Sequence, residues 1–128
     1  MDRAFLLIAG AFGFTGVAAG AFGAHALSAR LPAERLAVFE TAVRYLLWHT
    51  FAIFGVVVIR TIGPDAVCET VAGWCFVAGV VLFSGSLFAL ALTGERRWGM
   101  VTPFGGLALL AGWAAFVVAA ATVSFRFV

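Results

Sequence analysis

The chain contains too little charge for a water-soluble protein. Charged residues make up 11% of it and hydrophobic residues 64%, whereas charged residues make up about 25% of a typical soluble domain. The mean hydropathy of +1.12 agrees with this reading. A soluble fold of this composition could not cover its apolar core with polar side chains, so the composition indicates an integral membrane protein.

Lysine is absent, and the excess of positive charge is small. All eight basic residues are arginine and the formal net charge is +2, which is too little to indicate binding of nucleic acid. Most of the arginines lie near the ends of the long apolar stretches, where a guanidinium group can reach lipid head groups. We therefore expect membrane lipids, and no nucleic acid, among the partners.

The chain also lacks the motifs of common catalytic and metal sites. Its two cysteines, Cys68 and Cys75, lie seven residues apart, and this spacing of about two helical turns is too long for a mutual disulfide. No CxxC, phosphate-binding loop, HExxH motif, Ser-His-Asp set or deep pair of carboxylates occurs. We therefore expect that the protein is not an enzyme and holds no cofactor or metal.

Long uncharged stretches make up most of the sequence, namely residues 4–29, 45–59, 70–94 and 98–125. A bilayer core is about 30 Å thick and takes about 20 apolar residues of helix, and a helix satisfies its own backbone there. We expect one all-α domain, an antiparallel bundle of four transmembrane helices over about 4–27, 43–60, 67–92 and 102–125. Short connections would make successive helices antiparallel neighbours.

Residues 28–44 interrupt the apolar pattern before the second expected span. Pro32 suits the first position of a helix, and Glu34 would then lie in its first turn, where the helix dipole favours an anion. This pattern predicts a helix start that lies in the membrane interface, followed by the shortest of the four spans. Residues 61–65 (TIGPD) predict a turn, and residues 102–103 (TP) predict the N-cap and first residue of the fourth span.

Glycines recur on one face of the first span and near the start of the fourth. Small residues allow two helix backbones to approach closely, which stabilises helix pairs in lipid. Glycine is frequent in membrane helices generally, but a shared face favours a packing role. The glycines expected to pack against neighbouring helices are Gly10, Gly13, Gly16, Gly20, Gly23, Gly105, Gly106 and Gly112.

Polar residues gather in the sequence around the first loop and the start of the fourth span. The expected cluster consists of His25, Glu40, Arg44, Tyr45, His49 and Thr102. We expect His25 and His49 at similar depth, with a neutral His49 hydrogen-bonded to Thr102. Arg44 can pair with Glu40 at the i,i+4 spacing or bind a lipid phosphate. The cluster is a candidate ligand or head-group site, although buried polar groups often do no more than pair with a neighbouring helix.

Several segments of the chain resemble one family. They are GAFGAHAL (20–27), TAVRY (41–45) followed by His49, SGSLF (84–88), and TPFGG (102–106) followed by Gly112-Trp113. The sequence resembles the domain-of-unknown-function family numbered 423, small bacterial inner-membrane proteins that are similar to eukaryotic transmembrane protein 256. The resemblance implies four membrane helices in a bacterial inner membrane, and it implies no established activity.

Three kinds of function remain open. The favoured one is a structural or accessory protein that packs with itself, as a homo-oligomer, or with a larger membrane complex. The first alternative is a small-molecule, lipid-binding, quinone-binding or ion-conducting protein that uses His25, His49 and Arg44. The second is a haem or metal protein with both histidines as ligands and Arg96 or Arg97 near the propionates, although two histidines without a third ligand are a weak signal.

The arginines are unevenly divided between the two ends of the expected bundle. The first and third loops hold five of them, Arg30, Arg35, Arg44, Arg96 and Arg97, whereas the other end holds Arg3, Arg60 and Arg126. Cytoplasmic loops carry the larger share of basic residues in membrane proteins. We therefore expect the first and third loops in the cytoplasm and both termini outside.

Overall fold

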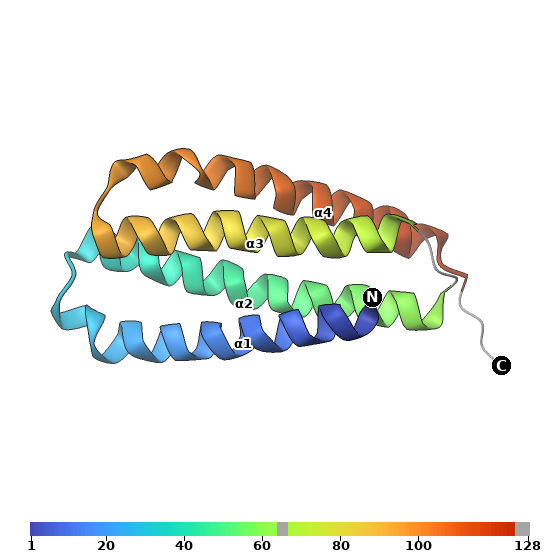
Figure 1. Cartoon of the computed structure of the whole chain (residues 1–128), viewed down its shortest axis with the longest axis horizontal. Helices are drawn as coiled ribbons and strands as arrows, with labels where there is room; N and C mark the ends of the chain where they lie inside the picture. The colour runs from blue at the N-terminus through green and yellow to red at the C-terminus, as the bar shows by residue number, and fades with distance from the viewer. Residues whose placement is uncertain (64–66, 125–128) are drawn as a thin grey trace.

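The computed structural model describes residues 1–63 and 67–124. Within these residues it contains α1 (Asp2–His25), α2 (Ala33–Ile62), α3 (Val67–Thr93) and α4 (Thr102–Thr122), together with the short 3-10 helices η1 (Leu27–Ala29) and η2 (Arg96–Met100). All four α-helices are long and apolar enough to cross a membrane. The expected fold of four antiparallel membrane helices is confirmed (Figure 1).

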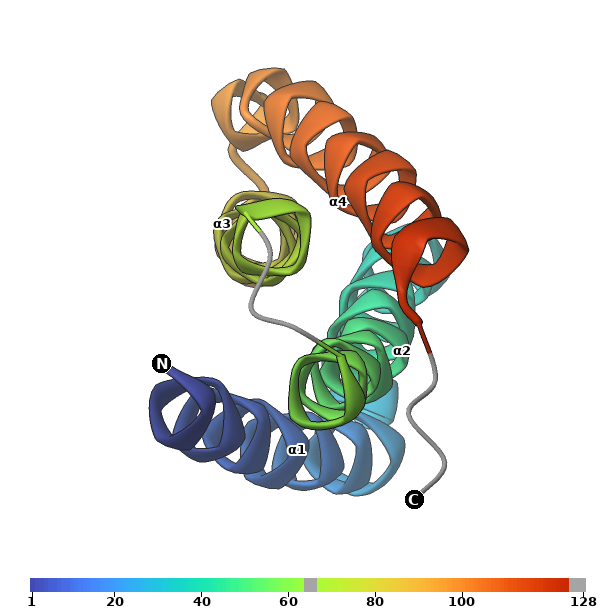
Figure 2. The same cartoon turned by 90° about the vertical axis from the view of Figure 1, so that its right-hand side faces the viewer.

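The helices are stacked in chain order. In Figure 1, α2 and α3 lie between α1 and α4, and the contacts are concentrated between successive helices. Viewed along its long axis, the molecule keeps α1 and α4 far apart, and α2 and α4 are inclined to one another (Figure 2). The arrangement is therefore open along one side, because the first and last helices do not close it into a ring.

Helix α2 differs most from the expectation. It runs unbroken from Ala33 to Ile62 over 30 residues, and Pro32 is its N-cap. The helix start predicted at Pro32 is present, and it continues without a break into the predicted second span over about 43–60. No glycine or proline interrupts the segment between Pro32 and Gly55, so the helix continues through its charged first turns toward the head groups.

The other boundaries lie close to the predicted ones. Val101 is the N-cap of α4, so Thr102 is its first residue and not its cap. The predicted turn over 61–65 is described only as far as Gly63, whose N–H is bonded to the Ile59 carbonyl. Three predictions fall on residues outside the described ones: the rest of that turn, the end of the fourth span at 125, and the position of Arg126 at the end of the bundle opposite the first loop.

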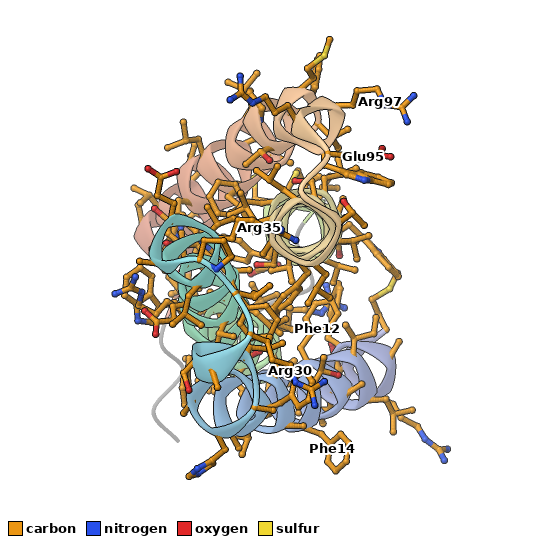
Figure 3. The ribbon with its side chains drawn as sticks, turned by 90° about the vertical axis from the view of Figure 1, so that its left-hand side faces the viewer. Phe12, Phe14, Arg30, Arg35, Glu95 and Arg97 are labelled. Carbon is orange, nitrogen blue, oxygen red and sulfur yellow. The ribbon has the colours of Figure 1, made fainter. Side chains whose placement is uncertain are left out.

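An arginine from α2 completes the end of α3. Gly94 follows α3 with a φ of 72°, a left-handed conformation that glycine adopts without steric cost. Arg35 then donates from Nε to the Ala91 carbonyl at 2.8 Å and from Nη2 to the Leu92 carbonyl at 2.9 Å. In Figure 3 the labelled Arg35 lies beside this end of α3. The last carbonyls of α3, which no helical N–H can reach, are thereby bonded to a second helix.

Large side chains against glycines set the spacing between helices. A Cβ on Gly16 would collide with Leu47 of α2, and one on Gly23 would collide with Phe39. Gly13 and Gly20 lie on the same side of α1 with ordinary contact distances to α2, of 3.7 Å to Thr50 and 3.5 Å to Val43. Gly10 has no neighbour within 4 Å, so it does not belong to this packing face.

The glycines of α4 differ among themselves. The backbone of Phe83 in α3 lies directly against Gly105, and Phe76 lies against Gly112. A Cβ on Gly106 would meet only the Phe83 ring, at 3.8 and 3.9 Å, which is an ordinary contact distance. The two adjacent glycines therefore differ: only a glycine at position 105 allows the close approach of the Phe83 backbone, whereas position 106 has room for a larger side chain.

We predict that Gly105→Ala destabilises the protein by about 2 kcal/mol, because the methyl group would push α4 away from the Phe83 backbone. Gly106→Ala is the matched control, and it should leave stability unchanged or raise it slightly because alanine favours helix. Reversible unfolding in detergent measures both changes. Equal stability of the two variants would contradict the close approach of α3 and α4.

The two arginine-bearing loops lie at the same end of the molecule. Arg30 and Arg97 are exposed there, as Figure 3 shows. We predict that Arg30→Cys and Arg97→Cys, each in a background with Cys68→Ala and Cys75→Ala, react with an impermeant thiol reagent from the same face of the membrane. Labelling from opposite faces would rule out the antiparallel order of the four spans.

Candidate functional site

His49 forms a polar link between two helices inside the molecule. Its side chain is buried, with Nδ1 at 2.7 Å from the Tyr45 carbonyl and Nε2 at 3.2 Å from Nε1 of Trp113 in α4. A carbonyl can only accept and an indole N–H can only donate, so the ring is a neutral tautomer with its hydrogen on Nδ1. Both ring nitrogens are satisfied, and one of these bonds joins α2 to α4.

The His49–Trp113 pair lies far from either end of its helices. His49 is near the middle of α2 (Ala33–Ile62), and Trp113 is near the middle of α4 (Thr102–Thr122). An unpaired polar group at that depth of a bilayer is costly, which favours this bond once the helices are assembled. The pair therefore provides a polar point near the middle of two membrane-crossing helices.

A groove lies beside this pair, between α2 and α4 with α3 behind it. Its volume is about 830 Å³, and it is lined by Tyr45, Trp48, His49, Phe83, Pro103, Gly106, Leu107, Leu109, Leu110 and Trp113. All of these residues belong to membrane-crossing helices. A molecule dissolved in the bilayer could therefore reach the groove sideways without passing through water.

Aromatic rings form much of the groove wall. Tyr45 stacks on Phe83 with ring centroids 4.3 Å apart, and Trp48 lies against Tyr45 at 5.3 Å. Trp113 meets His49 edge-on at 6.0 Å. Among residues 1–63 and 67–124, no hydrogen bond of the Tyr45 hydroxyl or the Trp48 indole is recorded. The groove thus combines flat apolar surfaces with two donors that have no partner in the described chain.

The structure does not bring the six predicted cluster residues to one place. His25 is exposed at the end of α1. Gly13 of α1 lies beside Thr50 and Gly23 beside Phe39, so His25 is displaced from His49 by about ten residues, or about 15 Å, along α2. The prediction of similar depth was wrong because α2 is one continuous helix from Ala33, so His49 lies 16 residues beyond the start of that helix.

Glu40 and Arg44 lie on a different face of α2 from Tyr45 and His49, because successive residues turn by about 100° around a helix. They line a separate groove of about 270 Å³ between α1 and α2. Arg44 is 3.5 Å from the Thr41 hydroxyl, and no ion pair between Glu40 and Arg44 is recorded in the described part of the chain. Binding of a lipid phosphate by Arg44 stays a prediction.

Thr102 does not bond to His49. Its hydroxyl lies 2.6 Å from the Ser86 hydroxyl of α3 and 3.4 Å from the Trp98 carbonyl. The predicted partner of His49 was therefore wrong, since Trp113 occupies that role about three turns farther along α4. Thr102 instead helps to hold the start of α4 against α3.

Comparison with known proteins identifies the family. The family described as "Protein of unknown function (DUF423)" matches residues 19–106. The chain belongs to this family. It is 41% identical over 125 residues to the UPF0382 inner membrane protein YgdD of Escherichia coli K12, covering 93% of this chain and 90% of that one.

Other relatives match over nearly their whole length. The UPF0382 membrane protein YwdK of Bacillus subtilis is 37% identical over 118 residues, covering 92% of this chain and 96% of the relative. A UPF0382 membrane protein of Staphylococcus haemolyticus is 38% identical over 127 residues, covering 98% of both. No solved structure matches the chain. The protein is thus a multi-pass cell-membrane protein of a family without a known activity.

Sequence reasoning missed the residues that complete the groove. Trp113 supplies the bond to His49, and Trp48 and Phe83 supply the aromatic wall. A signal for the tryptophans was present, because tryptophan favours the two membrane interfaces and both residues fall well inside their helices. No comparable signal marks Phe83 among the many phenylalanines of the chain.

A second buried polar group lies at the end of the molecule where α1 starts, α2 ends and α3 starts. Arg60 of α2 donates from Nε to the Asp2 carboxylate of α1 and from Nη1 to the Thr70 hydroxyl of α3, the latter at 2.6 Å. Glu69 is buried beside Thr70 on α3. The guanidinium group of Arg60 thus joins three helices.

The two histidines cannot ligate one haem in this arrangement. His25 is exposed at the end of α1, whereas Nε2 of His49 accepts the bond from Trp113. Between residues 1 and 63 and between 67 and 124, no three His, Cys, Asp or Glu side chains lie close enough to hold a metal ion. The haem alternative with both histidines as ligands is therefore not supported by their placement.

We predict that His49→Leu lowers stability by about 1 kcal/mol, because it leaves the Trp113 N–H unpaired in the membrane interior. His25→Leu is the matched control and should have no measurable effect, since His25 is exposed. Reversible unfolding in detergent compares the two variants. If the double variant His49→Leu/Trp113→Phe costs as much as the two single changes added together, the bond contributes nothing.

Proposed function

We propose that this protein is a non-enzymatic membrane protein that binds a small apolar molecule from the bilayer in the groove between α2 and α4. The groove itself is the observation that carries the proposal. Its volume of about 830 Å³ and its aromatic lining with few polar groups match ligand sites, which occur between helices of bundles. The ligand would enter sideways from the lipid.

The polar groups of the groove favour binding over catalysis. His49 and Trp113 are bonded to each other, and among the described residues no carboxylate, serine or cysteine lines the groove beside them. An ion path would need a chain of titratable groups across the membrane, whereas the groove lining is mostly apolar. Binding of a neutral ligand therefore agrees best with the side chains present.

The glycine face of α1 no longer supports a role in which this protein packs with other chains. The glycine face of α1 that suggested it is used inside the molecule, where Gly16 and Gly23 contact α2. An accessory role in a homo-oligomer or a larger complex stays a prediction, and it would have to use another surface. For orientation, we propose that the first and third loops face the cytoplasm, because five of the eight arginines lie in these loops or in the first half of α2 that adjoins them.

Filling the groove tests the proposal. Gly106 lines it, and an added Cβ there meets only the Phe83 ring at an ordinary distance, so Gly106→Leu should fold while its side chain occupies the groove. In a Trp74→Phe/Trp98→Phe background the remaining tryptophans, Trp48 and Trp113, both line the groove. We predict that a brominated alkylbenzene quenches their fluorescence saturably and that Gly106→Leu weakens this binding at least tenfold.

The control is Gly10→Leu, which adds the same side chain in open space on α1. It should bind the probe as the parent does, and both variants should unfold like the parent. Saturable quenching that Gly106→Leu leaves unchanged would show that the probe binds elsewhere. Quenching that rises linearly in the parent would show that the groove is no binding site.

A further inference from the structure

We propose that the ligand of this groove is a flat ring compound with a carbonyl oxygen, of the isoprenoid quinone class, and that its carbonyl accepts hydrogen bonds from Tyr45 and Trp48. This inference rests on the proposed function and adds the chemistry of the ligand. It is carried by the unpaired donors of the groove, by their depth in the membrane and by the arrangement of the rings around them.

The groove offers donors that need an acceptor. An indole N–H can only donate, and a phenol donates most readily to a carbonyl. The Trp113 N–H already bonds to His49, whereas the described chain gives neither the Trp48 N–H nor the Tyr45 hydroxyl a partner. Electrostatic complementarity therefore favours a ligand that brings an acceptor and no donor of its own.

The depth of these donors narrows the ligand further. Trp48 adjoins His49 near the middle of α2 (Ala33–Ile62), and Tyr45 lies about 4.5 Å nearer the first loop than Trp48. The hydrocarbon core extends about 15 Å to either side of the centre, so Trp48 lies inside it. The ester carbonyls of ordinary lipids lie at the edge of that core. An acceptor at this depth must belong to a molecule that is itself apolar.

The rings around the donors suit a planar ligand. Tyr45 stacks on Phe83 at 28° between ring planes, and Trp48 lies next to Tyr45. Aromatic faces and edges attract another ring in offset-stacked or edge-on geometry. Leu107 and Leu110 line the same groove from α4 and can contact an apolar tail. An acyl chain would use these leucines but not the donors, whereas a quinone would use both.

The ligand class is tested by comparing the binding of two matched probes and by removing the Tyr45 hydroxyl. The probes are a short-tailed benzoquinone and a brominated alkylbenzene with the same tail and no carbonyl, both measured by quenching of Trp48 and Trp113 in the full-length Trp74→Phe/Trp98→Phe protein. We expect the benzoquinone to bind about threefold to tenfold more tightly, because it gains a hydrogen bond. Tyr45→Phe removes only the hydroxyl, so it should reduce this advantage and leave alkylbenzene binding unchanged.

Two results would overturn the inference, and they separate it from the proposed function. If both probes bind equally, with Gly106→Leu blocking both and Tyr45→Phe affecting neither, the groove binds apolar molecules without recognising a carbonyl. If Gly106→Leu blocks neither probe, the groove is not the site and both proposals fail. A benzoquinone advantage that survives in Tyr45→Phe but is lost in Trp48→Phe would assign the contact to the indole alone, which still supports the ligand class.

Discussion

Contact between large side chains and glycines holds the helices of this protein together. In lipid, apolar side chains gain little by leaving the acyl chains for one another, so close packing must supply the attraction between helices. Two of the three pairs of successive helices have such contacts: Leu47 and Phe39 of α2 lie against glycines of α1, while Leu109 and Phe83 join α3 to α4. Phe5 of α1 also packs on Gly73 of α3. The spacing of the whole molecule depends on these fits.

Hydrogen bonds between helices add to this packing. Arg35 completes the end of α3, Ser84 donates to the Ala42 carbonyl at 2.8 Å, and Arg60 joins three helices at the opposite end. The His49–Trp113 bond differs from these because it joins α2 to α4, two helices that are not successive and are inclined to one another. This bond holds α2 and α4 together at one point along their length, and the groove lies beside that point.

The sequence predicted three helices well and one poorly. Helices α1, α3 and α4 begin and end within about three residues of the expected spans, because uninterrupted apolar runs determine their length. The second span was expected to be the shortest, whereas α2 is the longest helix. The helix start expected at Pro32 carries Glu34, Arg35, Glu40 and Arg44, and it continues into the span without a break. That error also placed His25 and His49 at the same depth.

The sequence by itself determined the number of spans, their antiparallel order and the membrane environment, because these follow from the length and spacing of apolar stretches. Only the tertiary structure decided which residues meet: Trp113 with His49, Thr102 with Ser86, and Phe83 with both Tyr45 and Gly105. The reason is that the membrane helices are apolar on nearly every side. Lipid-facing and protein-facing positions therefore have similar composition, and the contact face is set by the shapes of other helices distant in the chain.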